Sequence, residues 1–169
     1  MKLPPFVRES GLLSDEECEF LTRTEGEWQR QERTRHGTFG IRIWWQDLPE
    51  MPWLTERLRD AFERNNPWQL DLDGSVETRL LRYGEGDFTR PHVDYDHVHE
   101  DFAKITCICQ LVERGAFDGG VLEISERFRP TLDRGDALFF PSFSLHRVTK
   151  LNRGQRLALA GWARGPALR

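Results

Sequence analysis

From about residue 76 onward the chain is a succession of short segments rich in valine, isoleucine, leucine and aromatic residues. In order they read VETRLLRY, KITCICQLV, GGVLEIS, FRPTL, DALFFP, LHRVTK and RLALAGWA. Turn-forming residues separate them, at Gly84–Gly86, Asp118–Gly120, Arg134–Asp136 and Arg153–Gly154. Strands this short and this regularly spaced are typical of an antiparallel sandwich or a small barrel. The pattern predicts such a core over residues 76–164.

The segment before residue 76 carries helix signals. Ser14 followed by Glu17 is a capping-box pattern ahead of EECEFLTRT. In MPWLTERLRDAFERNNP, Pro52 stands where a helix can begin, and residues 65–67 can end it. The apolar positions of that stretch share one helical face: Leu54, Leu58, Ala61 and Phe62.

These signals predict a helical and mixed support region over about residues 1–75. Its helices are expected to cover one face of the β core, and GIRIWW (residues 40–45) to add an edge strand. The length of 169 residues favours a single domain over two. The predicted fold class is therefore α+β, mainly β.

Composition excludes several classes of function. Lys and Arg number 24 against 28 Asp and Glu, a net charge of −4, and no basic run is present, which argues against binding to nucleic acid. No apolar stretch is long enough to span a membrane, and no secretory leader is visible. The cysteines, Cys18, Cys107 and Cys109, are few and odd in number, which favours a reducing cytoplasm.

The segment RPHVDYDHVHED (residues 90–101) concentrates histidines and acids. His92 and Asp94 are two residues apart, so in an extended segment their side chains point to the same side. His146, after the apolar run of FFPSFSLHRVTK, can supply a third ligand. Two histidines and one carboxylate form the facial triad of non-heme Fe(II) oxygenases, which leaves three coordination positions open.

Two alternatives remain open for this segment. A lone H-x-D is most often a solvated turn. His97 and His99 are also two residues apart, as in cupin-type metal sites, although only the adjacent Glu100 follows them. We interpret Asp96–Asp101 as a hydrated loop beside the site.

The last strand-like segment carries a conspicuous arginine. In RLALAGWA, Arg156 shares one face with Ala158, Ala160 and Trp162, whereas Leu157 and Leu159 take the other. A guanidinium on a face of small apolar residues has room to bind a carboxylate in a bidentate manner. The alternative is a surface arginine on an edge strand.

Several segments of the chain resemble the Fe(II)/2-oxoglutarate-dependent dioxygenases, and among them the prolyl-4-hydroxylase-like and PKHD-type proteins. The segments also occur in the order that is typical of that family. They are Tyr83 and Gly86 ahead of HVD, then ITCICQLVE, FDGGVLEI, RGDALFFPSFSLHRV and RGQRLALAGW, over about residues 79–162. The resemblance implies a double-stranded β-helix (jelly roll) with the N-terminal helices packed on one face. It also implies an enzyme that hydroxylates an unactivated C–H bond with dioxygen.

The resemblance assigns roles to matched positions. The Fe(II) ligands and catalytic residues would be His92, Asp94 and His146. Arg156 would bind the distal carboxylate of 2-oxoglutarate, and Tyr83 would hydrogen-bond the cosubstrate. Val148 and Ala158 would line its pocket, with Trp162 closing the floor. Thr106 and Ile108 are expected to face the cavity, with Cys107 and Cys109 turned away. Ascorbate is a further expected reductant.

The substrate is less constrained by the sequence. Relatives carry a second tyrosine where this chain has Thr89, so the finer contacts of the site differ. By analogy we expect a prolyl or other residue of a peptide or protein. The alternatives are a free amino acid or natural-product intermediate, a non-catalytic sensor of iron and 2-oxoglutarate, and a cupin-like isomerase or other dioxygenase. The expected entrance residues are Arg35, Arg42, Trp44, Trp45 and the loop Asp96–Asp101.

Overall fold

The structure is a computed structural model that describes residues 2–35, 39–96, 100 and 102–168. The helices are α1 (Asp15–Thr22), α2 (Pro52–Arg64) and the 3-10 turn η1 (Arg114–Ala116). The strands are β1 (Val7–Glu9), β2 (Gln29–Arg35), β3 (Phe39–Asp47), β4 (Val76–Tyr83), β5 (Phe88–Thr89), β6 (Ala103–Gln110), β7 (Phe117–Gly119), β8 (Leu122–Ile124), β9 (Ala137–Pro141), β10 (His146–Val148), β11 (Leu151–Gly154) and β12 (Arg156–Arg164).

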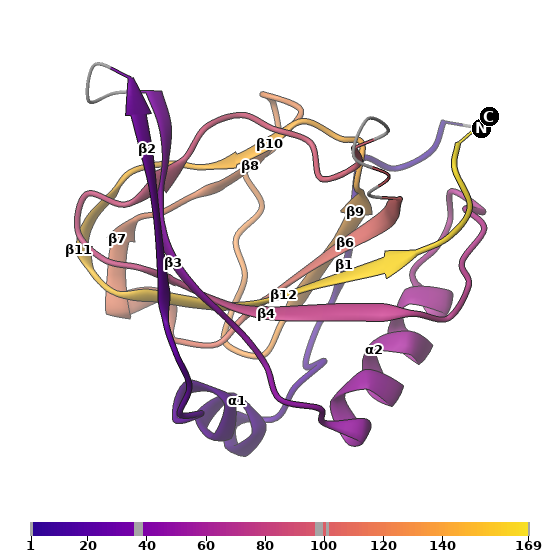
Figure 1. Cartoon of the computed structure of the whole chain (residues 1–169), viewed down its shortest axis with the longest axis horizontal. Helices are drawn as coiled ribbons and strands as arrows, with labels where there is room; N and C mark the ends of the chain where they lie inside the picture. Colours follow the sequence, from indigo (N-terminus) through magenta and orange to yellow (C-terminus); the bar gives the residue numbers. More distant parts are fainter. Residues whose placement is uncertain (1, 36–38, 97–99, 101, 169) are drawn as a thin grey trace.

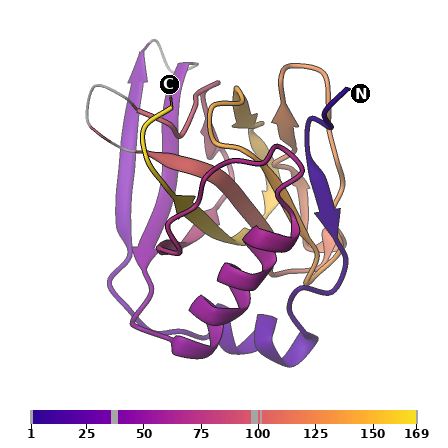
Figure 2. The same cartoon turned by 90° about the vertical axis from the view of Figure 1, so that its right-hand side faces the viewer.

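The strands form one large antiparallel sheet and two small pairs. The large sheet has the order β1-β9-β6-β12-β4-β3-β2, with β5 added against β3, and the pairs are β10-β8 and β11-β7. In Figure 1 the helices lie below the large sheet, the pair β10-β8 lies above it, and the pair β11-β7 lies at its left-hand end. The same arrangement, seen from the side, places both helices along one face (Figure 2). The expected antiparallel, mainly β architecture with helices on one face is confirmed.

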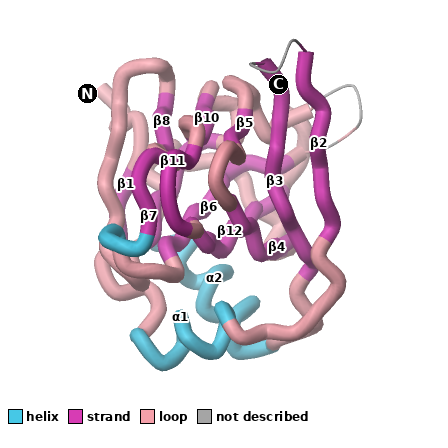
Figure 3. Tube along the Cα trace, turned by 90° about the vertical axis from the view of Figure 1, so that its left-hand side faces the viewer, coloured by secondary structure: helices cyan, strands magenta, loops and turns pink. Residues whose placement is uncertain are grey.

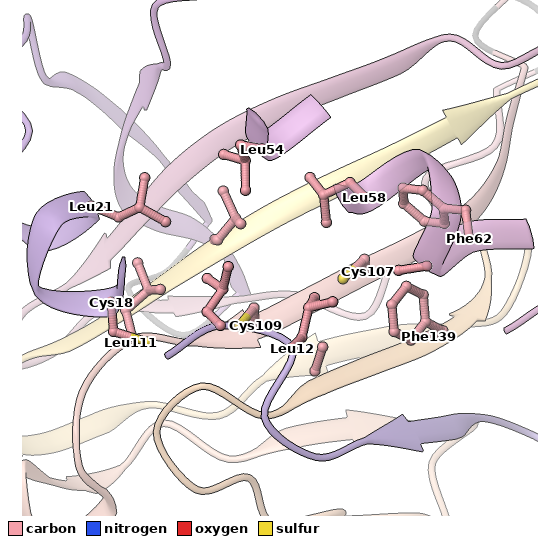
Figure 4. Packing of buried hydrophobic residues seen from close by; sticks show 14 of the residues in the cluster. Leu12, Cys18, Leu21, Leu54, Leu58, Phe62, Cys107, Cys109, Leu111 and Phe139 are labelled. Atoms are coloured by element: carbon pink, nitrogen blue, oxygen red, sulfur yellow. The ribbon is translucent and has the colours of Figure 1, made fainter. Parts of the chain in front are cut away.

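The helix-covered face of the sheet holds the larger apolar core. The four predicted positions of α2 are all buried there: Leu54, Leu58, Ala61 and Phe62. They pack against β6 and β9, where Cys107, Cys109 and Phe139 point toward the helices (Figure 4). Phe62 and Phe139 meet edge to face, with ring centroids 5.5 Å apart. The two cysteines are therefore packing residues, as expected from their direction.

The opposite face of the sheet, toward the small pairs, forms a second apolar cluster. Leu157 and Leu159 of β12 belong to the helix side, whereas Ala158, Ala160 and Trp162 belong to this second cluster. Strand alternation, predicted from the sequence, is thus observed along β12. The functional side chains described below all come from this face or its rim.

The predicted capping box opens α1. The amide of Glu17 donates to Ser14 Oγ at 3.1 Å, and the amide of Ser14 donates to Glu17 Oε1 at 2.9 Å.

We expect Ser14→Ala to lower the free energy of unfolding by about 1 kcal/mol, because one amide at the helix start loses its acceptor. Urea unfolding curves measure the change. Ser10→Ala, at an exposed turn position, is the control; an equal loss there would rule out the cap as the cause.

Two strand predictions need correction, one in each half of the chain. GIRIWW does not form an edge strand, because β3 pairs with β4 on one side and with β2 on the other. The edge is β2, whose sequence QRQERTR has no apolar alternation. Such a strand forms because the neighbouring strand β3 supplies its hydrogen-bonding partners. The sequence of β2 itself carries no local strand signal.

FRPTL (residues 128–132) was expected to be a strand and is not one. Only Phe128 makes an isolated bridge, back to Ile124, across a tight turn. Ser125 and Glu126 in that turn have positive φ values of 53° and 58°. Pro130 has no amide hydrogen to donate to a ladder, so the pairing cannot continue. Phe128 is kept near the core by edge-to-face packing on Phe6, at 5.9 Å.

None of the helices within the described ranges has the length and hydropathy needed to cross a bilayer.

Candidate metal and carboxylate site

Backbone pairing brings the two distant histidines together. The amide of His92 donates to the carbonyl of His146 at 3.0 Å, and the amide of His146 donates back at 2.9 Å. The two imidazole rings lie side by side, with centroids 4.3 Å apart. This contact joins the segment after β5 to the start of β10. The strands β5 and β10 lie next to each other at the end of the barrel away from the helices (Figure 3).

Asp94 completes a His–Asp–His cluster with His92 and His146. Its amide donates to the carbonyl of Ser142 at 2.8 Å, which fixes the backbone. One carboxylate oxygen lies 3.4 Å from His92 Nε2, and the other lies 3.4 Å from His146 Nε2. The possible ligand atoms of the three residues all lie within 4.8 Å of one another. One cation placed among them can therefore contact two nitrogens and an oxygen.

The outer ring nitrogens determine which tautomer each histidine takes. His92 Nδ1 lies 2.7 Å from the carbonyl oxygen of Arg90, and His146 Nδ1 lies 2.9 Å from that of Ser144. A carbonyl oxygen only accepts hydrogen bonds, so each neutral ring carries its hydrogen on Nδ1. The Nε2 lone pairs are then free to bind a metal at the centre of the cluster.

The carboxylate is held from behind by two neutral donors. Thr106 Oγ1 donates to Asp94 Oδ2 at 2.8 Å, and Trp162 Nε1 donates to the same oxygen at 2.9 Å. Burial acts to raise the pKa of Asp94, but the hydrogen bonds from His146 and His92 outweigh it and hold this pKa well below the usual range. For His92, burial acts to lower the pKa, but Asp94 raises it above its ordinary value. Asp94 is thus a charged, oriented carboxylate.

The indole of Trp162 was expected to close a pocket floor, and its bond to Asp94 was not foreseen. We expect Trp162→Phe to weaken metal binding about 10- to 100-fold, the usual effect of removing an outer partner of a metal ligand. Anaerobic Fe(II) titration measures the change. Trp45→Phe is the matched control, because Trp45 lines the same cavity from β3. Equal affinity in the two variants would remove Trp162 from the support of Asp94.

A cavity of about 120 Å³ opens beside the cluster. Besides the three residues of the cluster, it is lined by side chains from β2, β3, β4, β5, β6, β8, β10 and β12. Most of these side chains are apolar, including Ile43, Leu81, Ile108 and Val148. Such a lining limits the access of water to whatever the cavity holds.

Arg156 lines this cavity and is almost completely buried, with 3% of its surface exposed. Its guanidinium carbon lies 5.0 Å from the centre of the Tyr83 ring, across the β12–β4 pairing. Nη1 of Arg156 is buried and has no hydrogen-bond partner among the described residues. Burial lowers the pKa of Arg156, with Tyr83 opposing, and burial raises the pKa of Tyr83. A buried cation with an unpaired N–H is suited to an anionic ligand.

The other residues that were predicted to line the cosubstrate pocket lie only partly along this cavity. Tyr83, Val148 and Trp162 line the cavity, whereas Ala158 belongs to the same apolar cluster but is not among the lining residues. The role of Ala158 in lining the cosubstrate pocket stays a prediction. Thr89 also lines the cavity, and its hydroxyl accepts from the amide of Val148 at 2.8 Å.

The expected entrance residues divide between the two faces of β3. Trp45 lines the cavity, whereas Trp44 lies on the other face under the guanidinium groups of Arg30 and Arg82, at 5.3 and 5.2 Å. Arg42 is also on the outer face, and its Nε lies 3.4 Å from Oε1 of Glu32. His97, His99 and Asp101 lie outside the described residues, as does the side chain of Arg35.

Sequence reasoning missed Arg79 and Gln31 as lining residues. Arg79 stacks on Trp45 at 4.3 Å. The alternation of VETRLLRY places it on the same face as Leu81 and Tyr83, which is the signal that identifies it. Gln31 has no comparable signal, because β2 itself was not predicted.

Comparisons with known proteins agree with this geometry. The family model described as the 2OG-Fe(II) oxygenase superfamily matches residues 78–164. A PKHD-type hydroxylase of Caulobacter vibrioides is 36% identical over 91 residues, 48% of this chain and 40% of that protein. A second, of Idiomarina loihiensis, is 33% identical over 113 residues, 64% of this chain and 52% of that protein. The chain thus matches about half or less of the length of these relatives.

Solved structures show the same fold. The prolyl-4-hydroxylase of Pseudomonas putida superposes with a TM-score of 0.71 at 22% identity, covering 96% of this chain and 94% of that one. The viral collagen prolyl hydroxylase of Paramecium bursaria Chlorella virus-1, solved as a 2-oxoglutarate complex, gives 0.70 at 15%, covering 96% and 97%. The expected double-stranded β-helix is confirmed. Because the family model covers the strands that carry the His–Asp–His cluster and Arg156, the chain belongs to the 2OG-Fe(II) oxygenase superfamily.

Proposed function

We propose that this chain is a hydroxylase that uses Fe(II), 2-oxoglutarate and dioxygen. His92, Asp94 and His146 hold the metal, and Arg156 binds the distal carboxylate of 2-oxoglutarate. The observation that carries the proposal is the convergence of two imidazole nitrogens and one carboxylate in a cavity that also contains a buried guanidinium, whose Nη1 has no hydrogen-bond partner among the described residues. Nitrogen and carboxylate ligands suit Fe(II), and three ligands leave positions for other molecules.

When bound, Fe(II) with 2-oxoglutarate and dioxygen supplies the oxidising chemistry that inserts one oxygen atom into a C–H bond and releases succinate and carbon dioxide. The chain contributes position and charge. The carbonyls of Arg90 and Ser144 keep Nε2 of both histidines available, and Trp162 and Thr106 keep Asp94 in place. Arg156 orients the cosubstrate, with Tyr83 beside it, and the apolar lining excludes water. Ascorbate as a further reductant stays a prediction.

A peptidyl substrate, with proline as the first candidate, is supported by the surface beside the cluster. Val93, Phe143 and Leu145 are among the most exposed large apolar side chains, at 45%, 45% and 37%. All three are immediate or near neighbours in sequence of the proposed ligands. Exposed apolar side chains on the segments that carry the ligands suit an extended peptide better than a small charged metabolite. A free amino acid or a natural-product intermediate is the second candidate, because Arg79 lines the cavity, although Asp47 and Glu77 already pair with it at 3.3 and 3.4 Å.

Two further expectations join the proposal. Residues 1–169 act as one domain, because β1, β2 and β3 belong to the same sheet as β4, β6, β9 and β12. The protein works in the cytoplasm, which is supported by three buried cysteines that are all free.

Anaerobic titration with Fe(II) and 2-oxoglutarate tests the central proposal. We expect a weak visible charge-transfer band that needs both additions and disappears in His146→Ala. Admission of dioxygen should then release succinate, and a screen of proline-containing peptides and free amino acids should find a product heavier by one oxygen atom. A band without succinate would identify a sensor instead, and turnover independent of 2-oxoglutarate would favour the cupin-like alternative.

A further inference from the structure

Arg156 also lines a second cavity, of about 230 Å³. Arg156 and Leu122 line both cavities, but none of the three proposed metal ligands lines the second one. Its mouth includes Thr131 and Arg114, both exposed, so it opens to the surface. A small molecule can therefore reach Arg156 without passing the metal.

Gln110 is the polar side chain that stands beside Arg156 in this second cavity. It pairs across the sheet with Ala158, which is two residues from Arg156 on the same face of β12. Gln110 and Arg156 are therefore diagonal neighbours on one face, close enough to contact the same small group. At the other end of the same two strands, Thr106 and Trp162 are direct cross-strand partners, and both donate hydrogen bonds to Asp94.

Both of these buried side chains have a donor with no partner. Gln110 and Arg156 are each 3% exposed, and Nε2 of Gln110 and Nη1 of Arg156 lack hydrogen bonds among the described residues. The backbone of Gln110 is fully paired, with Asp136 and Gly135. Unpaired buried donors are rare in proteins because each loses its bonds to water. Both residues line this cavity, so one acceptor placed there can meet the amide of Gln110 and the guanidinium of Arg156 together.

The remaining walls restrict what the acceptor can be. Leu122, Leu132 and Phe117 are apolar, and a charge-assisted hydrogen bond is stronger in such surroundings. At the rim, Arg114 is already paired with Asp133 at 2.9 Å, and Asp118 adds a negative charge. A second anionic group would meet that charge. The walls thus favour a ligand with one carboxylate and a short apolar body.

We propose that this second cavity is a binding site for a small monocarboxylic acid, held by the guanidinium of Arg156 and the amide of Gln110. The site shares its cation with the cosubstrate. Two carboxylates on one guanidinium repel each other, so each ligand weakens the binding of the other by the same factor. This coupling rests on the proposed role of Arg156 in binding 2-oxoglutarate, whereas binding of the acid does not.

Butyrate is the probe, and ligand-observed NMR on the metal-free protein is the measurement. We expect saturable binding that weakens about tenfold or more in Gln110→Leu, which removes a hydrogen bond to a charged group and keeps the volume. Thr131→Trp, at an exposed position of the mouth, should block binding without disturbing the core. Gln31→Leu is the matched control, because Gln31 lines only the metal-side cavity, and it should leave butyrate binding unchanged.

A second arm tests the coupling. In the iron-loaded protein under argon, butyrate should raise the 2-oxoglutarate concentration needed for the charge-transfer band, and Thr131→Trp should abolish that effect. Absence of butyrate binding, or binding that survives both variants, overturns the site. If Gln110→Leu weakens 2-oxoglutarate binding while butyrate does not bind, the amide serves the cosubstrate and the separate site is wrong. Butyrate binding without succinate formation would instead contradict the proposed hydroxylase.

Discussion

Asp94→Gly is expected to abolish 2-oxoglutarate-dependent hydroxylation and to weaken Fe(II) binding by more than about 100-fold. Mutation of an outer partner of a metal ligand already costs about 10- to 100-fold, and Asp94 is a proposed ligand itself. Its loss also removes the only negative charge in the His–Asp–His cluster. Equilibrium Fe(II) titration and succinate release per added peptide measure the two effects.

The variant has to be distinguished from an unfolded protein. Removal of Asp94 leaves the indole N–H of Trp162 without its acceptor, whereas Thr106 keeps Ser142 Oγ as a partner at 2.9 Å, so we expect a loss of stability of about 1–3 kcal/mol, which a folded domain tolerates. Thermal unfolding checks this. His97→Ala and His99→Ala provide the comparison, because the cupin-like alternative places the metal on those two residues. Wild-type turnover in Asp94→Gly together with loss in the histidine variants would falsify the ligand assignment.

Local patterns predicted the elements that carry their own signal. The face of α2 and the capping box of Ser14 depend on spacings within a few residues, and both were predicted correctly. The alternation along β12 was equally local, since each side chain in a strand alternates regardless of its neighbours. The polar strand β2 has no such signal. It exists because β3 offers it a row of hydrogen bonds, and that depends on tertiary structure.

The residues of the candidate site divide in the same way, into those with a local sequence signal and those that depend on tertiary structure. The spacing of His92 and Asp94 made a shared direction foreseeable. The apolar run before His146 and the alternation around Arg156 singled out these two residues, and the resemblance to a known family assigned their roles. The bond from Trp162 to Asp94 was not foreseeable, because it joins residues of β12 to the segment after β5 through their register in three dimensions. The second cavity, which Arg156 also lines, has the same origin: Gln110 looks like an ordinary strand residue until its pairing with Ala158 is known.

Arg156→Ala is expected to weaken 2-oxoglutarate binding by about 2–5 kcal/mol, the range for removing one partner of a buried charge pair. Fe(II) binding should change little, because Arg156 is not part of the His–Asp–His cluster. The charge-transfer band, titrated with 2-oxoglutarate at saturating Fe(II), measures the affinity. Arg82→Ala is the control on the neighbouring strand, since Arg82 stacks on Trp28 and Trp44 outside the cavity.

Two further variants of Arg156 distinguish a role in binding from a role in the structure. Arg156→Lys keeps the charge and loses the planar fork, so we expect an affinity between those of the wild type and Arg156→Ala. Arg156→Met removes a buried cation that has an unpaired N–H, so the ligand-free protein should unfold at the same temperature or higher. A residue kept for packing would behave in the opposite way, with lower stability and intact 2-oxoglutarate binding. That result would remove Arg156 from the site and leave the cosubstrate without its anchor.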